Sequence, residues 1–394
     1  MQGPLTAPSP SLSILVDAPG LDGLIGALRG RGYDVLGPRV MGTAINLAPI
    51  AKAEDLPHGW ISRQEAGSYR LEQSPSGGSF GYGPAVDSLK RYLNPPVSTI
   101  WRATREDGAL RFEPSPAPPA PLAIVGARPC DLHAMARYDD VFLNGPYKDP
   151  GYEARRASLF IVAANCTTPG GTCFCASMAT GPRASAPFDV ALTELAGAPG
   201  AERYVATSGS AIGTAVLEQL HAAAATSADL AEEQRLLDDA AKHMGRTLRM
   251  TGLASTLSAA AEHPQWDDVA HRCLACANCT MVCPTCFCST VDDRTNLAGT
   301  VMERERRWDS CFTGEFSYIH GGSTRPSTRA RYRQWLTHKF LYWADQFGAP
   351  GCVGCGRCIT WCPVGIDITQ EIGSLGRLSR VGGERRRATL QGRR

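Results

Sequence analysis

The segments CLACANCTMVCP at residues 273–284 and CVGCGRCITWCP at residues 352–363 decide the fold of this chain. Both have the spacing C-x2-C-x2-C-x3-C-P, by which bacterial ferredoxins hold [4Fe–4S] clusters through thiolate sulfur. The closing proline cannot continue a helical hydrogen-bond ladder, so the chain turns away after the fourth cysteine. Two copies with identical spacing predict two [4Fe–4S] clusters and a role in carrying electrons.

The fourth cysteine of each segment is expected to bind the cluster of the other segment, as it does in two-cluster ferredoxins. The expected ligands are Cys273, Cys276, Cys279 and Cys362 for cluster 1, and Cys352, Cys355, Cys358 and Cys283 for cluster 2. Zinc is the alternative, because it also takes four thiolates, but zinc modules usually separate two C-x2-C pairs by a longer span. Cysteines this dense in a long chain argue against a disulfide framework.

Composition narrows the class of protein further. A net charge of +2 over 394 residues gives no general argument for nucleic acid or an acidic substrate. No stretch reaches the roughly 18 apolar residues of a membrane span, and the first residues show no secretory signal. With fifteen cysteines in metal-like groups, these features lead us to expect a protein of the reducing cytoplasm.

The pattern of apolar runs and breakers predicts an α+β chain with several parts. Short alternating or apolar runs such as 12–16, 122–126 and 159–164 indicate strands, and the alanine- and leucine-rich stretch after 211 indicates helices. The expected parts are an N-terminal α/β region (1–112), a proline-rich connector (113–121), a second α/β region with a cysteine-rich loop (122–210), a helical bridge (211–265), a mostly helical dicluster ferredoxin-type domain (266–378) and a basic tail (379–394).

The ferredoxin-type domain carries a long insertion between its two cysteine segments. Its charged and aromatic residues include Arg304, Arg306, Arg307, Trp308, Arg325, Arg329, Arg331, Arg333, Trp335 and Tyr342. A solvated helix face accounts for such charges, and docking to a partner subunit is the alternative, since tryptophan and arginine are enriched in interfaces. The glycine-rich stretch 77–84 is interpreted as a plain loop, because it lacks the strand and the full fingerprint of a phosphate-binding loop.

Seven cysteines remain outside the two ferredoxin segments. Thr-Cys-Phe-Cys occurs twice, at 172–175 and 285–288. A third [4Fe–4S] cluster would take its four thiolates from Cys166, Cys173, Cys175, Cys286, Cys288 and Cys311. The alternative, that these are small buried apolar side chains, is equally open. Cys130 stands alone in the sequence and is expected to be structural. No catalytic acid–base or nucleophilic group stands out.

Several strings around these cysteines resemble one known family. They are TMVCPTCFC at 280–288, WDSCF at 308–312, GCGRCITWCPVGID at 354–367, RPCD at 128–131, NCT at 165–167 and GGTCFC at 170–175. They resemble the iron–sulfur (beta) subunit of soluble heterotetrameric NiFe hydrogenases, or sulfhydrogenases, and the related iron–sulfur subunit of anaerobic sulfite reductase. The resemblance extends over nearly the whole chain.

The resemblance implies an electron-transfer subunit in a larger complex. A flavoprotein subunit would exchange hydride with NAD(P)H and pass on single electrons, and NiFe hydrogenase small and large subunits would perform the terminal chemistry. A siroheme sulfite reductase core is the alternative to the hydrogenase, and an independent ferredoxin-like carrier is the alternative to a complex. Since the sequence shows neither NiFe ligands nor a siroheme site, we expect no hydrogen or sulfite turnover from this chain alone.

Overall fold

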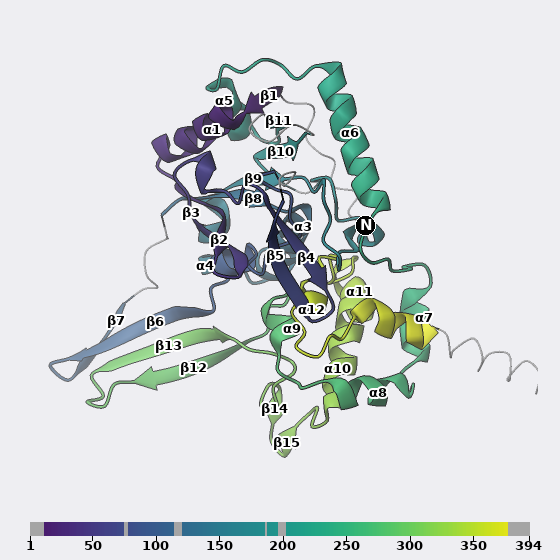
Figure 1. Ribbon diagram of the computed structural model, residues 1–394. Helices are drawn as coiled ribbons and strands as arrows, with labels where there is room; N and C mark the ends of the chain where they lie inside the picture. The colour runs from purple at the N-terminus through teal and green to yellow at the C-terminus, as the bar shows by residue number, and fades with distance from the viewer. Residues whose placement is uncertain (1–11, 75–77, 114–119, 186, 196–201, 377–394) are drawn as a thin grey trace, which may run out of the picture.

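The computed structural model describes residues 12–74, 78–113, 120–185, 187–195 and 202–376 (Figure 1). The basic tail (379–394) lies outside the described residues, as does most of the proline-rich connector. Helices and sheets are both well represented, with sheets concentrated in the N-terminal half and helices around the two cysteine segments. The expected α+β class is confirmed.

One mixed sheet of seven strands, counted within the described residues, forms the body of the N-terminal half. Its four central strands are parallel, and antiparallel strands close both edges. In sheet order the strands are β1 (Ser13–Asp17), β11 (Arg203–Ser208), β10 (Val190–Glu194), β9 (Leu159–Ala164), β8 (Leu122–Ala127), β2 (Asp34–Met41) and β3 (Ala44–Pro49). Strands of both expected α/β regions therefore share one sheet.

Helices cover both faces of this sheet, because its central strands are apolar on both sides. Along β9, Phe160 and Val162 face one core, which includes Leu24 and Leu28, and Ile161 faces the other, which includes Met135. The first core is covered by α1 (Ala18–Gly30) and α5 (Ala211–Glu218), and the second by α2 (Lys90–Leu93), α3 (Pro129–Phe142) and α4 (Pro150–Ala157). A short turn of helix, η1 (Ala53–Asp55), joins the first core.

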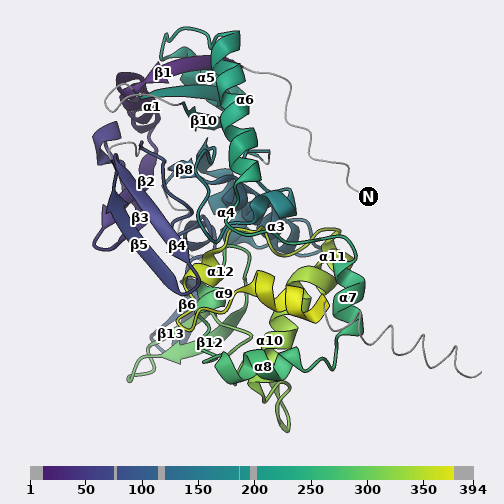
Figure 2. The same ribbon diagram turned by 45° about the vertical axis from the view of Figure 1, so that its right-hand side comes forward.

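The expected helical bridge begins with two separate helices. The break falls between α5 and α6 (Ser227–Lys242), where Thr226 and Asp229 form a capping box at the start of α6. Figures 1 and 2 show α6 running from the sheet toward the helices around the cysteine segments. The bridge therefore joins the two halves of the molecule.

The insertion forms strands as well as helix, which corrects the interpretation of its charges as one helix face. Arg304, Arg306 and Arg307 lie on β13 (Val301–Trp308), where Arg304 pairs across the ladder with Asp293. This strand joins β12 (Ser289–Thr295), β6 (Val97–Glu106) and β7 (Ala109–Glu113) in a sheet that projects from the body (Figure 1). A small hairpin follows, β14 (Tyr318–Ile319) with β15 (Gly322–Ser323).

Short helices surround the two cysteine segments in the C-terminal half. They are α7 (Leu253–Ala259), α8 (Gln265–Arg272), α9 (Asn278–Met281), α10 (Thr328–Thr337), the π-helix His338–Tyr342, α11 (Trp343–Phe347) and α12 (Arg357–Thr360), with further helical residues at 368–376. The η2 turn (Cys175–Met178) belongs to the cysteine-rich loop after β9.

A hairpin of the N-terminal half reaches into this helical part (Figure 2). It consists of β4 (Trp60–Glu65) and β5 (Ser68–Gln73). The amide of Gly67 donates to the carbonyl of Ile359 at 3.1 Å, and Tyr69 stacks on Trp361 with ring centroids 5.0 Å apart. The hairpin thus fixes the second cysteine segment against the α/β body.

Candidate metal centres

The two cysteine segments adopt the same local conformation. In each, the backbone is left-handed two and four residues after the first cysteine, at Ala275 and Ala277 in the first and at Gly354 and Gly356 in the second, with φ between 51° and 73°. The amide of Ala275 points at the sulfur of Cys273, and that of Gly354 at the sulfur of Cys352, each at 3.4 Å. Each segment therefore forms a loop with amides directed at its own thiols, followed by a short helix.

Glycine replaces alanine in the second segment because another loop packs against it. A Cβ on Gly354 would lie 2.7 Å from the backbone of Phe174 and Cys175, and one on Gly356 would lie 2.4 Å from the carbonyl oxygen of Thr172. The cysteine-rich loop after β9 is thus in direct backbone contact with the second segment.

The first cysteine group joins both segments. Cys273, Cys276 and Cys279 line one small cavity together with Cys362 of the second segment, and Cys358 reaches the same cavity. Its remaining wall is largely apolar and includes Phe312, Tyr332 and Trp335. The structure therefore brings together the four residues expected for cluster 1.

The second group is more deeply buried. Burial raises the pKa of Cys352 to about 12, and the neighbouring Cys355 and Cys283 add to the rise. Cys283 also acts electrostatically on Cys358. Cys283, from the first segment, thus lies among the three thiols of the second, the set expected for cluster 2.

Two lysines that the sequence analysis did not single out are buried beside this group. Lys339, on the π-helix and 4% exposed, places its Nζ 3.3 Å from the sulfur of Cys283. Lys90 donates to the carbonyl oxygen of Thr280 at 3.2 Å and lies over the ring of Trp308. A buried ammonium needs an anionic or strongly polar partner. These lysines therefore place positive charge where thiolates would be negative.

The seven other cysteines fall into two groups, which differs from the single set of six expected for a third cluster. Cys166, Cys173 and Cys175 lie with Cys130 around one enclosed apolar site. Cys130 was expected to be structural; its position after β8 brings it beside a loop distant in sequence, which spacing alone does not reveal.

The second of these groups lies near the lysines. Cys288 and Cys311 share a hydrogen bond between their thiols, and Cys286 bonds to Cys283. Tyr138 donates to the carbonyl oxygen of Cys286 at 2.8 Å. The two Thr-Cys-Phe-Cys copies therefore belong to different groups.

The donor sets were compared with what metals require. Among the residues that the structure describes, no three His, Cys, Asp or Glu side chains form a site for a single metal ion. The four thiolates of a cubane bind four separate irons and need not converge on one point. Burial raises the pKa of Cys173 to about 12, so this thiol is protonated at neutral pH until metal displaces the proton. Four-thiol groups with an apolar lining fit [4Fe–4S] clusters.

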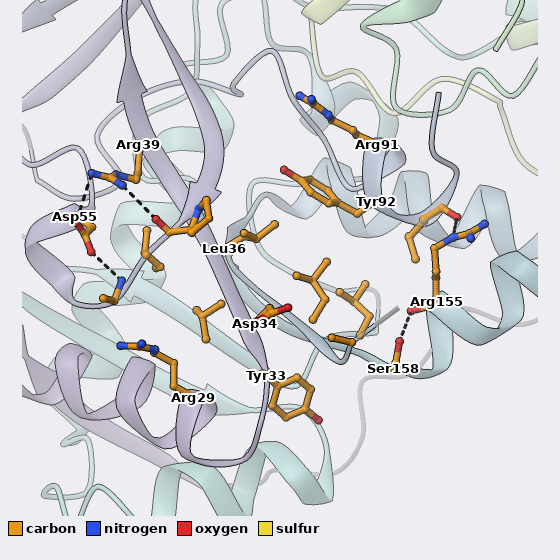
Figure 3. A pocket seen from close by; sticks show the side chains of 18 of the residues that line it. Arg29, Tyr33, Asp34, Leu36, Arg39, Asp55, Arg91, Tyr92, Arg155 and Ser158 are labelled. Atoms are coloured by element: carbon orange, nitrogen blue, oxygen red, sulfur yellow. Dashed lines mark hydrogen bonds and ion pairs between the residues drawn. The ribbon is translucent and has the colours of Figure 1, made fainter. Parts of the chain in front are cut away.

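A separate cavity of about 960 Å³ lies at the other edge of the sheet (Figure 3). It is bordered by Asp34, Leu122 and Leu159, at the amino ends of the parallel strands, whereas open α/β sheets bind ligands at the carboxyl ends. Two of its arginines are already bonded, Arg39 to Asp55 and Arg155 to the carbonyl oxygen of Leu93. This cavity shows no link to the cysteine groups.

Comparison with known proteins agrees with the cysteine geometry. Residues 272–366 match the family model of the 4Fe-4S dicluster domain. The chain is 35% identical over 254 residues to the sulfhydrogenase 2 subunit beta of Pyrococcus furiosus, which covers 64% of this chain and 73% of the relative. No helix within the described residues is long and apolar enough to cross a membrane.

The fold and the cysteine groups define an iron–sulfur protein of the electron-transfer class that binds [4Fe–4S] clusters. The chain belongs to the family of iron–sulfur beta subunits of sulfhydrogenases.

Proposed function

We propose that this chain relays electrons through two [4Fe–4S] clusters between a NiFe hydrogenase core and an NAD(P)H-oxidising flavoprotein subunit. The observation that carries the proposal is the interleaving of the two cysteine segments, in which Cys362 lies with the first three cysteines of the other segment and Cys283 does the same in return. When bound, each cluster accepts and releases one electron.

The ligand sets follow the same interleaving. Cluster 1 is held by Cys273, Cys276, Cys279 and Cys362, and cluster 2 by Cys352, Cys355, Cys358 and Cys283. Because each segment contributes to both sites, neither site forms without the other segment in place. This arrangement keeps the clusters close together, which one-electron transfer requires.

The surroundings of the two sites differ in ways that suit a relay. Cys276 is exposed, so cluster 1 lies near the protein surface, whereas Cys283 and Cys355 are buried. The apolar wall of Phe312, Tyr332 and Trp335 excludes water from the first site. Lys339 and Lys90 supply positive charge beside the second site. Hydrogen bonds, charge and burial set cluster potentials, so the two sites will differ in potential.

The proposed partners rest on the relative rather than on contacts within this chain. The relative's name describes one subunit of a sulfhydrogenase, which favours a hydrogenase core over a siroheme sulfite reductase. The chain would act in the cytoplasm, where the nicotinamide cofactor and thiolate-bound clusters are maintained. It would hold no catalytic residue of its own.

Affinity purification of the tagged chain from its native cells tests the assignment. We expect it to bring down both a flavin-containing and a nickel-containing protein, detected by flavin fluorescence and metal analysis. Recovery of a siroheme protein in place of nickel would move the chain to a sulfite reductase. Recovery of a monomer that carries all its clusters would identify an independent carrier.

A further inference from the structure

The group of Cys130, Cys166, Cys173 and Cys175 lies at the edge of the sheet where α/β proteins bind ligands. Cys130 follows β8 in the first turn of α3, and Cys166 follows β9 by two residues. These strands are parallel neighbours, so their carboxyl ends meet at one edge. The loop that continues from Cys166 returns Cys173 and Cys175 to the same edge.

All four thiols are buried in an apolar enclosure. Their residues are between 3% and 8% exposed. The other residues around the site are Pro84, Pro129, Pro169, Pro182, Met244 and Cys355. Four thiols that converge from three stretches of chain exceed what a simple apolar core needs, since one or two methyl groups would fill such a space with less loss of solvation.

A buried cation faces this group. Arg128 is 2% exposed, and its Nη1 lies 3.7 Å from the sulfur of Cys166. Its Nη2 donates to the carbonyl oxygens of Phe80 and Tyr82, and no carboxylate forms an ion pair with it among the described residues. Because a buried guanidinium requires a negative partner, its position points to thiolates rather than thiols at this site. The amino end of α3 adds positive potential at Cys130.

We propose that Cys130, Cys166, Cys173 and Cys175 hold a third [4Fe–4S] cluster, with Arg128 as its counter-charge. Compared with the six cysteines expected from the sequence, this set omits Cys286, Cys288 and Cys311 and adds Cys130, the residue expected to be structural. The proposal extends the proposed electron relay and rests on it for the role of the cluster, but not for its existence.

The site adjoins cluster 2 through the second cysteine segment. Cys355 lies at the same enclosure, and Cys173 contacts its carbonyl oxygen at 3.7 Å. The amide of Phe174 donates to the carbonyl oxygen of Gly354 at 2.8 Å, and Thr180 donates to that of Val353 at 2.7 Å. The third site is thus bonded directly to the loop that holds cluster 2, and one electron lost by one cluster is gained by its neighbour. The relay would then extend from the ferredoxin part into the α/β body.

Iron counting on the full chain, reconstituted without oxygen with iron and sulfide, tests the site. Replacing Cys173→Ala and Cys175→Ala together should lower the iron content by about four per chain, because a cubane contains four irons. Met244→Leu is the matched control, since Met244 lies 3.8 Å from Cys175 but is not in the ligand set, and it should retain the wild-type content. Equal iron in the double variant and the wild type would overturn the proposal.

An iron-edge anomalous map of the wild-type protein gives an answer that does not depend on how the variants fold. We expect a peak enclosed by the sulfurs of Cys130, Cys166, Cys173 and Cys175, beside those at the two ferredoxin segments. Peaks at the ferredoxin segments alone would overturn the third site and leave the proposed function intact. A map without iron at any cysteine group would overturn both.

Discussion

The ammonium nitrogen of Lys339 lies 3.3 Å from the sulfur of Cys283 and 3.1 Å from the hydroxyl of Thr285, with the lysine 4% exposed. Cys283 is the residue by which the first cysteine segment reaches the second group. The lysine sits on a π-helix, a feature that is frequent at functional sites. A fixed positive charge at this ligand stabilises the more negative, reduced form of the cluster that Cys283 binds.

Lys339→Met should therefore lower the reduction potential of cluster 2. The side-chain volume is nearly kept, so the main change is the loss of one buried charge. At an effective dielectric constant of about 20, that loss is expected to shift the potential by roughly 100 mV. A redox titration followed by electron paramagnetic resonance measures the shift. Lys148→Met, which alters an exposed lysine, should leave both potentials unchanged. An unchanged potential in Lys339→Met would show that the lysine does not act on the cluster.

Gly356→Ala should destabilise the contact between the cysteine-rich loop and the second segment. Gly348→Ala is a matched control, because both glycines have φ of +73° but a Cβ at 348 meets nothing within 4 Å. The control pays only the left-handed backbone cost of about 1 kcal/mol, whereas Gly356→Ala should cost about 2 kcal/mol more. Urea unfolding of the iron-loaded chain measures both. Equal losses in the two variants would mean that the loop moves aside without cost.

Arg246→Gln should loosen three parts of the structure at once. Arg246 bonds to Asp367 at 2.7 Å, to Glu65 on β4 at 2.8 Å and to the carbonyl oxygen of Gly171 at 2.8 Å. The side chain of Asp367 is 1% exposed, so it would keep a buried carboxylate without its cation, at a cost of about 3 kcal/mol.

The control for Arg246→Gln is an exposed ion pair on the same hairpin. Arg63→Gln removes the partner of Glu72 on the surface and should change the free energy of unfolding by less than about 1 kcal/mol. Both variants are compared by urea unfolding of the iron-loaded chain. Similar small losses in the two would show that Asp367 finds other partners.

The sequence predicted the elements whose periodicity is local. The apolar runs at 122–126 and 159–164 form β8 and β9, and the break expected within 222–227 separates α5 from α6. The cysteine spacing also predicted that Cys362 and Cys283 would exchange partners, since this follows from a pattern within each segment. That ligand assignment stays a prediction until clusters are observed.

What the sequence did not predict depends on contacts between distant segments. Cys130 joins Cys173 and Cys175 only because β8 and β9 are parallel neighbours. Two apolar strands, each followed by a cysteine, were a signal for this site that spacing within single motifs passes over. Lys339 gave no local signal, because its burial depends on how the insertion folds back over Cys283. The charges of β13 suggested a helix face, since alternating strand residues resemble one when they are mostly arginine and glutamate.

The central claim, that each cysteine segment completes the cluster of the other, is tested most directly by iron counting in two backgrounds. In a chain that has lost cluster 1 through Cys273→Ala and Cys276→Ala, adding Cys362→Ala should remove no further iron. In a chain that has lost cluster 2 through Cys352→Ala and Cys358→Ala, the same addition should remove about four more irons, because couplings appear only between residues of one site. The opposite pattern, with further loss only in the first background, would assign Cys362 to its own segment's cluster and contradict the account.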